Sequence, residues 1–142
     1  MKPFIRSAIA SDLPTLDDIE QASFGSPNWD ADSFLKYTCF IAELECRVAG
    51  FLVSRQVFPG YQGSKPEREI LNVAVAPLYR RLGIATALLN HALSSGATHY
   101  LEVRESNVAA RRLYERLGFA EIARRPNYYS SPVETAIVME MK

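Results

Sequence analysis

Residues 73 to 85 read Val-Ala-Val-Ala-Pro-Leu-Tyr-Arg-Arg-Leu-Gly-Ile-Ala, and this stretch decides how the chain is interpreted. Its apolar first half predicts the end of a buried strand, Pro77 stops the strand, and Gly83 opens a helix. A helix N-terminus carries unpaired N–H donors and the positive end of the helix dipole, which together suit a phosphate. Arg80 and Arg81 add positive charge and forked donors. The pattern predicts an anion-binding turn, although an ordinary helix entry fits the same residues.

The elements on either side of this turn follow from hydrophobic spacing and turn residues. Strands are expected at 4–9, 39–45, 47–57, 69–76, 98–104, 119–125 and 134–141. Helices are expected from an N-cap at Ser11 to about Ala22, from Asp30 to about Tyr37, from Leu82 to Ser94, and from Ser106 or Asn107 to about Leu117. Residues 58–66 and the polar segment 127–132 are expected to be loops. This order indicates an α/β or α+β fold around one mixed sheet.

Length and composition bound the class of protein. The 142 residues predict a single domain, 1–142, and 48% hydrophobic with 23% charged residues is an ordinary globular mix that excludes a disordered chain. No apolar run reaches the roughly 18 residues of a membrane span, and no signal peptide is expected. With only Cys39 and Cys46, a zinc cage is not expected, and the simplest interpretation is a reduced, cytoplasmic protein.

Net charge argues against nucleic acid as a partner. The chain has 16 basic and 16 acidic residues, so a broad nucleic-acid footprint is not expected. The charges are unevenly placed, with 4 basic and 8 acidic residues in 1–50 and the reverse, 8 and 4, in 80–125. The later segment favours an anionic ligand, and chance surface variation explains the same asymmetry. We expect no metal and no membrane contact, and a monomer or weak homodimer.

The turn resembles the acetyl-CoA signature of the Gcn5-related N-acetyltransferases (GNAT), in which Gln or Arg is followed at fixed spacing by Gly and then by Gly or Ala. Arg80, Gly83 and Ala85 stand at these three positions. The resemblance implies a twisted, mostly antiparallel sheet of about seven strands with about four helices. It also implies that acetyl-CoA lies along the strand end and on the backbone amides of the turn. The cofactor-binding residues so implied are Val73, Ala74, Val75, Arg80, Arg81, Leu82, Gly83, Ile84, Ala85 and Thr86, together with Asn107.

A second block, from Leu101-Glu-Val-Arg-Glu-Ser-Asn107 through Leu117-Gly-Phe119 to Asn127-Tyr-Tyr129, is similar to the RimI-type members of that family. Those members acetylate the N-terminal amine of a small-subunit ribosomal protein. Phe24 and Trp29, before a short helix, are similar too. Three features depart from the pattern: Leu82 stands where a polar residue is common, the 58–66 loop is long, and the connection 127–135 is short.

The resemblance implies that Glu102 is the general base and Tyr114 the general acid. An amine attacks a thioester only when it is neutral, so a base must take its proton, and an acid can protonate the departing thiolate. We expect the two side chains to border one gap on the same side of the sheet. Taken alone, Glu102 fits a solvated strand position, Tyr114 fits the apolar stripe of its helix, and Asn107 fits an N-cap.

The acceptor favoured by this chemistry is a protein N-terminus. A free α-amine has a pKa of about 7.7–8.0 and lysine one of about 10.4, a difference worth roughly 3.3–3.7 kcal/mol. A lone glutamate therefore completes deprotonation of a terminal amine more readily than that of lysine. No acyl-enzyme is expected, because neither cysteine falls in the predicted gap. A small-molecule amine such as a polyamine or an antibiotic, and a non-catalytic CoA-binding module, remain open.

Several other residues are assigned less directly. Tyr61, Tyr128 and Tyr129 are candidates for an acceptor-binding groove, and packing or turn formation explains each of them as well. Arg124 and Arg125 are interpreted as a solvated strand end. His91 and His99 lack partners at metal-ligand spacing.

Overall fold

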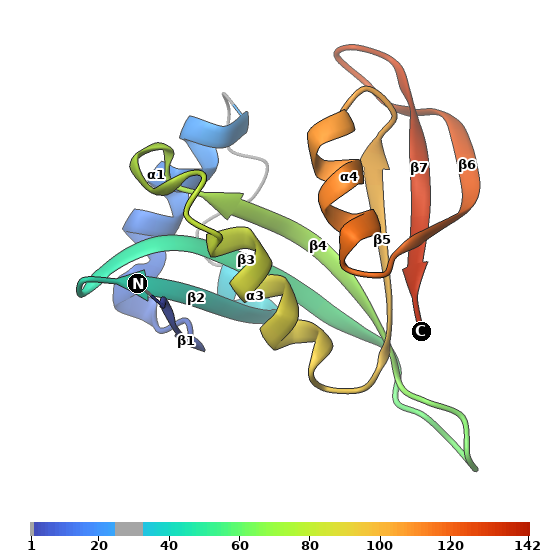
Figure 1. Ribbon diagram of the computed structural model, residues 1–142, viewed down its shortest axis with the longest axis horizontal. Coiled ribbons are helices and arrows are strands. Elements are labelled where there is room, and N and C mark those ends of the chain that lie inside the picture. Colours follow the sequence, from blue (N-terminus) through green and yellow to red (C-terminus); the bar gives the residue numbers. More distant parts are fainter. Residues whose placement is uncertain (1, 25–32) are drawn as a thin grey trace. The chain divides into compact units, whose positions relative to one another are not determined.

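The strands and helices follow the predicted order along the chain (Figure 1). The computed structural model describes residues 2–24 and 33–142. The strands are β1 (Phe4–Ser7), β2 (Thr38–Leu44), β3 (Arg47–Phe58), β4 (Glu67–Val75), β5 (Thr98–Arg104), β6 (Ala120–Tyr129) and β7 (Glu134–Met141). The helices are α1 (Leu13–Phe24), α2 (Ser33–Lys36), α3 (Ile84–Leu93) and α4 (Val108–Arg116), with 3-10 turns η1 (Ala10–Asp12) and η2 (Pro77–Tyr79).

Strand pairing runs in the order β1-β2-β3-β4-β5-β7-β6, which confirms a mixed α/β fold with one seven-stranded sheet. The chain divides into two units, and β4 contributes to both. The first unit is Met1–Arg55 with Leu71–Ser95, and the second is Gln56–Ile70 with Gly96–Lys142. None of the helices in the described stretches combines the length and apolarity that a bilayer crossing needs.

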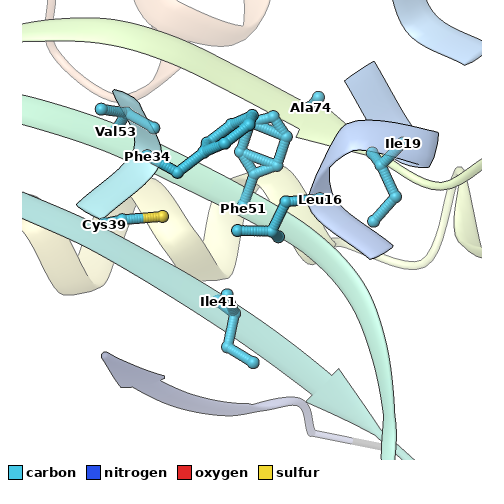
Figure 2. Close-up of a cluster of buried hydrophobic side chains, with 8 residues drawn as sticks. All are labelled: Leu16, Ile19, Phe34, Cys39, Ile41, Phe51, Val53 and Ala74. Atoms are coloured by element: carbon cyan, nitrogen blue, oxygen red, sulfur yellow. The ribbon is translucent and has the colours of Figure 1, made fainter. Parts of the chain in front are cut away.

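The core of the first unit gathers side chains from α1, α2, β2, β3 and the end of β4 (Figure 2). Phe34 and Phe51 meet edge to face, with ring centroids 5.1 Å apart, and both are fully buried. Such aromatic pairs add stability beyond the area that they bury. The other buried members are Leu16, Ile19, Cys39, Ile41, Val53 and Ala74. This packing fixes the strand end from which the turn at 76–83 departs.

A bulge in β3 ties the end of β4 to its neighbour in the first unit. The β2–β3 register shifts between Ala42 and Glu43, and the Ala49 carbonyl accepts a 2.7 Å hydrogen bond from the Ala76 amide. A Cβ on Gly50 would lie 2.7 Å from the Ala74 carbonyl oxygen, so no larger residue fits there without a backbone shift. Glycine thus permits the close approach that sets the exit direction of β4.

The second unit is built on β5. Its residues Thr98–Leu101 pair in parallel with Glu67–Ile70 of β4, and its other edge pairs with β7, which in turn pairs with β6, both antiparallel. Leu101 and Val103 are buried, whereas the residues that alternate with them are only half-buried. One face of this unit's sheet is therefore an apolar core surface, and the other carries polar side chains.

Three predictions of local structure are wrong. Ser11 is not the cap of the first helix: the chain enters through η1, where the Asp12 carboxylate accepts from the Ile9 amide at 2.8 Å. The segment 127–132 is not entirely loop, because β6 resumes pairing at Tyr129 after a bulge. The third helix begins at Ile84, since η2 and an extended Arg80 come before it. The break at 25–28, Trp29 and the expected cap Asp30 lie outside the described residues, and the single-domain assignment stays a prediction.

We expect Asp12→Asn to lower the free energy of unfolding by about 2 kcal/mol, because it breaks a charge pair whose carboxylate is buried. Arg6 donates to both Asp12 oxygens at 2.9 Å. Hydrogen bonds from Arg6 lower the pKa of Asp12, so this contribution is complete above the unfolded value of about 3.9 and is lost as the pH falls through the folded value. Urea unfolding from pH 7 to pH 3 measures it.

The control is Asp18→Asn, an exposed carboxylate on α1, which should change stability by less than about 0.5 kcal/mol. An Asp12→Asn deficit that stays constant down to pH 3 would contradict the role of ionised Asp12.

Candidate active site

The turn before α3, in the first unit, presents backbone amides without protein partners. Within the described chain, the N–H groups of residues 81 to 86 donate to no protein acceptor, and the first amide bonded inside the helix is that of Ala87, to Gly83 at 3.0 Å. A helix start leaves such donors orphaned, and here they lie beside exposed residues at 80–83. The turn can therefore accept an anion without displacing any internal bond.

Gly83 is required by the backbone of this turn. It has φ +77°, a left-handed conformation, and a Cβ placed there would meet nothing within 4 Å. The cost of a larger residue is therefore backbone strain, not a clash with protein. Arg81 is also left-handed, with φ +64°. Left-handed residues within a turn are a feature of anion-binding nests.

Some of the signature residues around Gly83 stabilise the turn, and others are exposed to solvent. The Arg80 side chain donates from Nε to the Val75 carbonyl at 3.3 Å, so part of its role is to brace the turn. Arg81 and Leu82 are exposed, whereas Ile84 is buried and anchors the helix. Of the strand-end residues, Ala74 is buried and Val73 and Val75 are half-buried.

Asn107 acts as the N-cap of α4. Its Oδ1 accepts from the Ala110 amide at 3.2 Å, the geometry by which a cap satisfies one orphan donor. Of the two roles that the sequence left open, the cap is thus present in the folded chain.

Glu102 lies on the polar face of the second unit, where the register gathers functional groups from three strands. Glu102 is opposite Val138 and Arg104 is opposite Ala136 on β7, and Ala136 is opposite Arg125 on β6. Paired residues share a face, so these five side chains lie in two adjacent rows on one side of the sheet. Strands β5 and β6 are not neighbours, yet their charged residues face the same surface.

Arg125 is the ion-pair partner of Glu102. Its Nη1 donates to Glu102 Oε2 at 3.0 Å. The Glu102 side chain is 17% exposed and that of Arg125 is 56% exposed, so the guanidinium lies on the solvent side of the carboxylate. Arg124 and Arg125 are exposed, as expected, but they lie within β6 instead of at its end, and each forms an ion pair. Arg124 forms ion pairs with Glu105 and Glu121. Glu121 is opposite Met139 of β7, which belongs to the apolar face of the sheet.

A bulge in β6 brings Tyr128 and Tyr129 to this polar face. Three residues, 126 to 128, lie between Arg125 and Tyr129, opposite a single residue of β7. Asn127 takes the left-handed φ of +57° within the bulge. The two tyrosine rings then meet edge to face, 5.1 Å apart, and each lies against an arginine: Arg125 is 4.3 Å from the Tyr128 ring centroid and Arg104 is 4.4 Å from that of Tyr129.

Arg104 holds the β6–β7 turn against the end of β5. It donates to the carbonyls of Ser130 and Pro132 and to Glu134 Oε1 at 3.1–3.2 Å. Glu134 also accepts from the Ser106 amide at 2.6 Å, and hydrogen bonding from Ser106 lowers the pKa of Glu134, with a further contribution from Arg104. These bonds fix the segment that carries both tyrosines.

Tyr114 comes from the opposite face of the sheet. Helix α4 lies against β5 (Figure 1). A Cβ on Gly118, just after the helix, would be 3.3 Å from the sulfur of Met141, and Met141 is opposite His99 on the apolar face. The helix therefore covers the apolar side of β5. The Tyr114 ring contacts that of buried Phe119, with centroids 5.7 Å apart. Glu102 and Tyr114 therefore lie on opposite faces, which overturns the expectation that they share a side.

Tyr129 and Tyr114 both have a raised pKa. Burial raises the pKa of Tyr129 to about 12, and the charge of Glu102 and, more weakly, Tyr114 add to the effect. Burial raises the pKa of Tyr114 as well. Both phenols are accordingly protonated at neutral pH and can serve as hydrogen-bond donors.

Tyr61 is not brought to this group. It lies 68% exposed in the hairpin between β3 and β4, bridged to Ser64. That hairpin leads into the residues of β4 that pair with the start of β5, whereas Tyr129 lies against Arg104 at the end of β5. Its role in acceptor binding stays a prediction.

The cysteines and histidines stand apart from these groups. Burial raises the pKa of Cys39 to about 12, and Cys46 is exposed in the β2–β3 turn. His99 is fully buried, and burial lowers its pKa, so it is neutral. The described residues contain no group of three or more His, Cys, Asp or Glu side chains arranged to hold a metal.

Three residues of the polar face were not predicted from the sequence to belong to the site: Arg104, Arg125 and Glu134. Arg104 could have been found, since it shares with Glu102 the polar alternation of β5. Arg125 and Glu134 could not, because the row that they complete depends on β7 lying between β5 and β6.

Comparison with known proteins identifies the family. Residues 8–119 match the Acetyltransferase (GNAT) family. This chain belongs to the GNAT acetyltransferases. It is 36% identical to the [ribosomal protein bS18]-alanine N-acetyltransferase of Escherichia coli strain K12, over 96% of this chain and 95% of that protein. The confirmed family makes it an acetyl-CoA-dependent acetyltransferase.

Solved GNAT structures have the same fold. The crystal structure of the ribosomal-protein-S18-alanine N-acetyltransferase from Escherichia coli superposes with a TM-score of 0.84 at 35% identity, covering 98% of this chain and 92% of that one. The structure of Ard1 from Thermoplasma volcanium gives 0.85 at 27% identity, covering 99% and 97%.

We expect Asn107→Ala to lower the free energy of unfolding by about 1 kcal/mol, because the Ala110 amide loses its acceptor. Asn107→Asp keeps a cap oxygen and should retain most of the stability. Thermal unfolding of the two variants measures this, alongside CoA titration. Weakened CoA binding in both variants at preserved stability would show that the amide also contacts the cofactor.

Proposed function

We propose that this GNAT enzyme acetylates the N-terminal α-amine of a protein, with acetyl-CoA as donor. The observation that carries the donor part is the run of unpartnered amides at residues 81 to 86. Support for the acceptor comes from the relative that shares 36% identity over almost the whole chain and is named for alanine N-acetylation of a ribosomal protein. The lower pKa of an α-amine relative to lysine points the same way.

The proposed donor site fits the residues present. The amides of the turn and the dipole of α3 would hold the pyrophosphate, aided by the charge of Arg81. The open space at Gly83 leaves room for a bulky anion to approach the backbone. Val73, Ala74 and Val75 would lie along the pantetheine. Acetyl-CoA supplies the acetyl group as a thioester, and the chain's own residues position it and manage the protons.

Glu102 would take the proton that the acceptor ammonium must lose before its nitrogen can attack the acetyl carbon. As that N–C bond forms, the C–S bond breaks and negative charge gathers on sulfur. Tyr114 would donate a hydrogen bond to that sulfur. The nitrogen loses a second proton as the amide forms, and the thiolate takes up one proton with Tyr114 as the general acid, so the products are the amide and free CoA. The base and the donor act on different atoms and need not share a face of the sheet.

Tyr128 and Tyr129 would border the path of the acceptor toward Glu102, since both rings lie on its face of the sheet. Two free cysteines suit a reducing compartment, and we propose a cytoplasmic location.

We expect CoA to bind in the micromolar range and Gly83→Ala to weaken that binding by roughly ten-fold, because a left-handed alanine is strained and adds a methyl where the anion approaches. Gly96→Ala is the matched control: Gly96 has φ +81° and equally open space, but it lies after α3. Isothermal titration measures both. Equal weakening in the two variants would attribute the effect to stability, and no binding of CoA at millimolar concentration to the wild type would contradict the donor site.

We expect Glu102→Gln and Tyr114→Phe each to lower kcat by about 10²-fold or more, with CoA affinity nearly unchanged, because Glu102 contacts the acceptor and the hydrogen bond from Tyr114 strengthens only as charge gathers on sulfur. Initial rates with an alanine-led peptide and with a polyamine measure this and separate the two acceptor classes. Wild-type turnover in either variant would remove that residue from the mechanism, and a preference for the polyamine would overturn the N-terminal acceptor.

A further inference from the structure

Arg125 stands between Glu102 and solvent. Its side chain is 56% exposed and that of Glu102 is 17% exposed, with the two joined at 3.0 Å. A group that binds Glu102 Oε2 in the place of the guanidinium must displace this contact.

The pair spans β7 from one neighbouring strand to the other. Arg125 begins opposite Ala136, and Glu102 begins opposite Val138, one row away on the far side. Two strand spacings amount to roughly 10 Å, so both side chains must lean across β7 to meet. A partly exposed contact made by two extended side chains is weak, on the order of 1 kcal/mol or less, and can be exchanged.

Tyr128 gives Arg125 a second partner, and burial raises the pKa of the same tyrosine, with a contribution from hydrogen bonding to Glu102. The guanidinium carbon is 4.3 Å from the centroid of the Tyr128 ring, and this contact stabilises the cation. Arg125 can thus leave Glu102 without losing all of its stabilisation.

The charges require an exchange. An acceptor amine reaches Glu102 as an ammonium, and two cations at one carboxylate oppose each other. Guanidinium does not lose its proton, so Arg125 cannot supply the proton that a base would remove. An acceptor ammonium in the same place can give its proton to Glu102.

We infer that Arg125 is a placeholder cation, which occupies Glu102 in the free enzyme and is displaced by the ammonium group of the acceptor. The inference rests on the proposed function, because it takes Glu102 as the base. While Arg125 holds Oε2, that oxygen is not available to a water molecule that attacks the thioester. Attack by water, which would give acetate and free CoA, is suppressed until a cationic acceptor arrives. The pair therefore selects cationic amines over neutral nucleophiles.

The test compares Arg125→Met, which keeps the length of the stem without the charge, with Arg125→Lys and with Arg124→Met. Arg124 is the adjacent control, 46% exposed and paired with other carboxylates. Acetyl-CoA hydrolysis is measured without an acceptor, and KM and kcat are measured with an alanine-led peptide. We expect Arg125→Met to raise hydrolysis and to lower the peptide KM, each about three-fold, the scale of a partly exposed ion pair. Arg125→Lys should restore the low hydrolysis only in part, because its ammonium can lose a proton to Glu102, and Arg124→Met should resemble the wild type.

The outcomes separate the inference from the proposed function. The rise in hydrolysis should vanish in the double variant Glu102→Gln with Arg125→Met. A lower kcat in Arg125→Met with unchanged hydrolysis and KM would make Arg125 a positioning residue for Glu102 and overturn the placeholder. If Arg124→Met raised hydrolysis and lowered the peptide KM to the same extent, the effect would be a general one of charge, and the placeholder role of Arg125 would be overturned. If hydrolysis rises as expected but no variant acetylates the peptide, the placeholder stands and the proposed acceptor is wrong.

Discussion

The position of β7 between β5 and β6 is the constraint on which the polar face of the second unit depends. Antiparallel pairing on both sides of β7 puts residues from three separate stretches of sequence into common rows. The bulge at 126–128 then adds two rings to the same surface. Without that register, Glu102 and Arg125 would be unrelated charged residues 23 positions apart.

In the first unit, the backbone N–H groups of residues 81 to 86 have no hydrogen-bond acceptor among the described residues, although the chain is folded. Buried backbone groups are normally paired, so a run of free amides is stable only where it faces outward. The bulge at Ala49, the close approach at Gly50 and the left-handed Gly83 together place the start of α3 in that condition. The same backbone that leaves the amides open thus prepares the turn for an anion, at little cost to the fold.

Much of the fold was predictable because local signals agreed with one another. The limits of β5 were predicted correctly, and Asn107 was one of two expected caps. The Ser11 cap failed because the chain enters the helix through a 3-10 turn capped at Ile9, and Asp12, held by Arg6, accepts from the Ile9 amide. The extent of β6 failed because a left-handed Asn127 reads as the start of a loop, although pairing resumes at Tyr129.

The sequence by itself determined the order of elements, the glycine and arginines of the anion-binding turn, and the family resemblance, because each depends on short spacings within one segment. Only the tertiary structure decided that Arg125 covers Glu102, that Arg104 and Glu134 fasten the tyrosine segment, and that Tyr114 approaches from the other face. Those relations arise from strand order and register. When two residues that pair lie far apart in the chain, the sequence around either one contains no pattern that predicts the other.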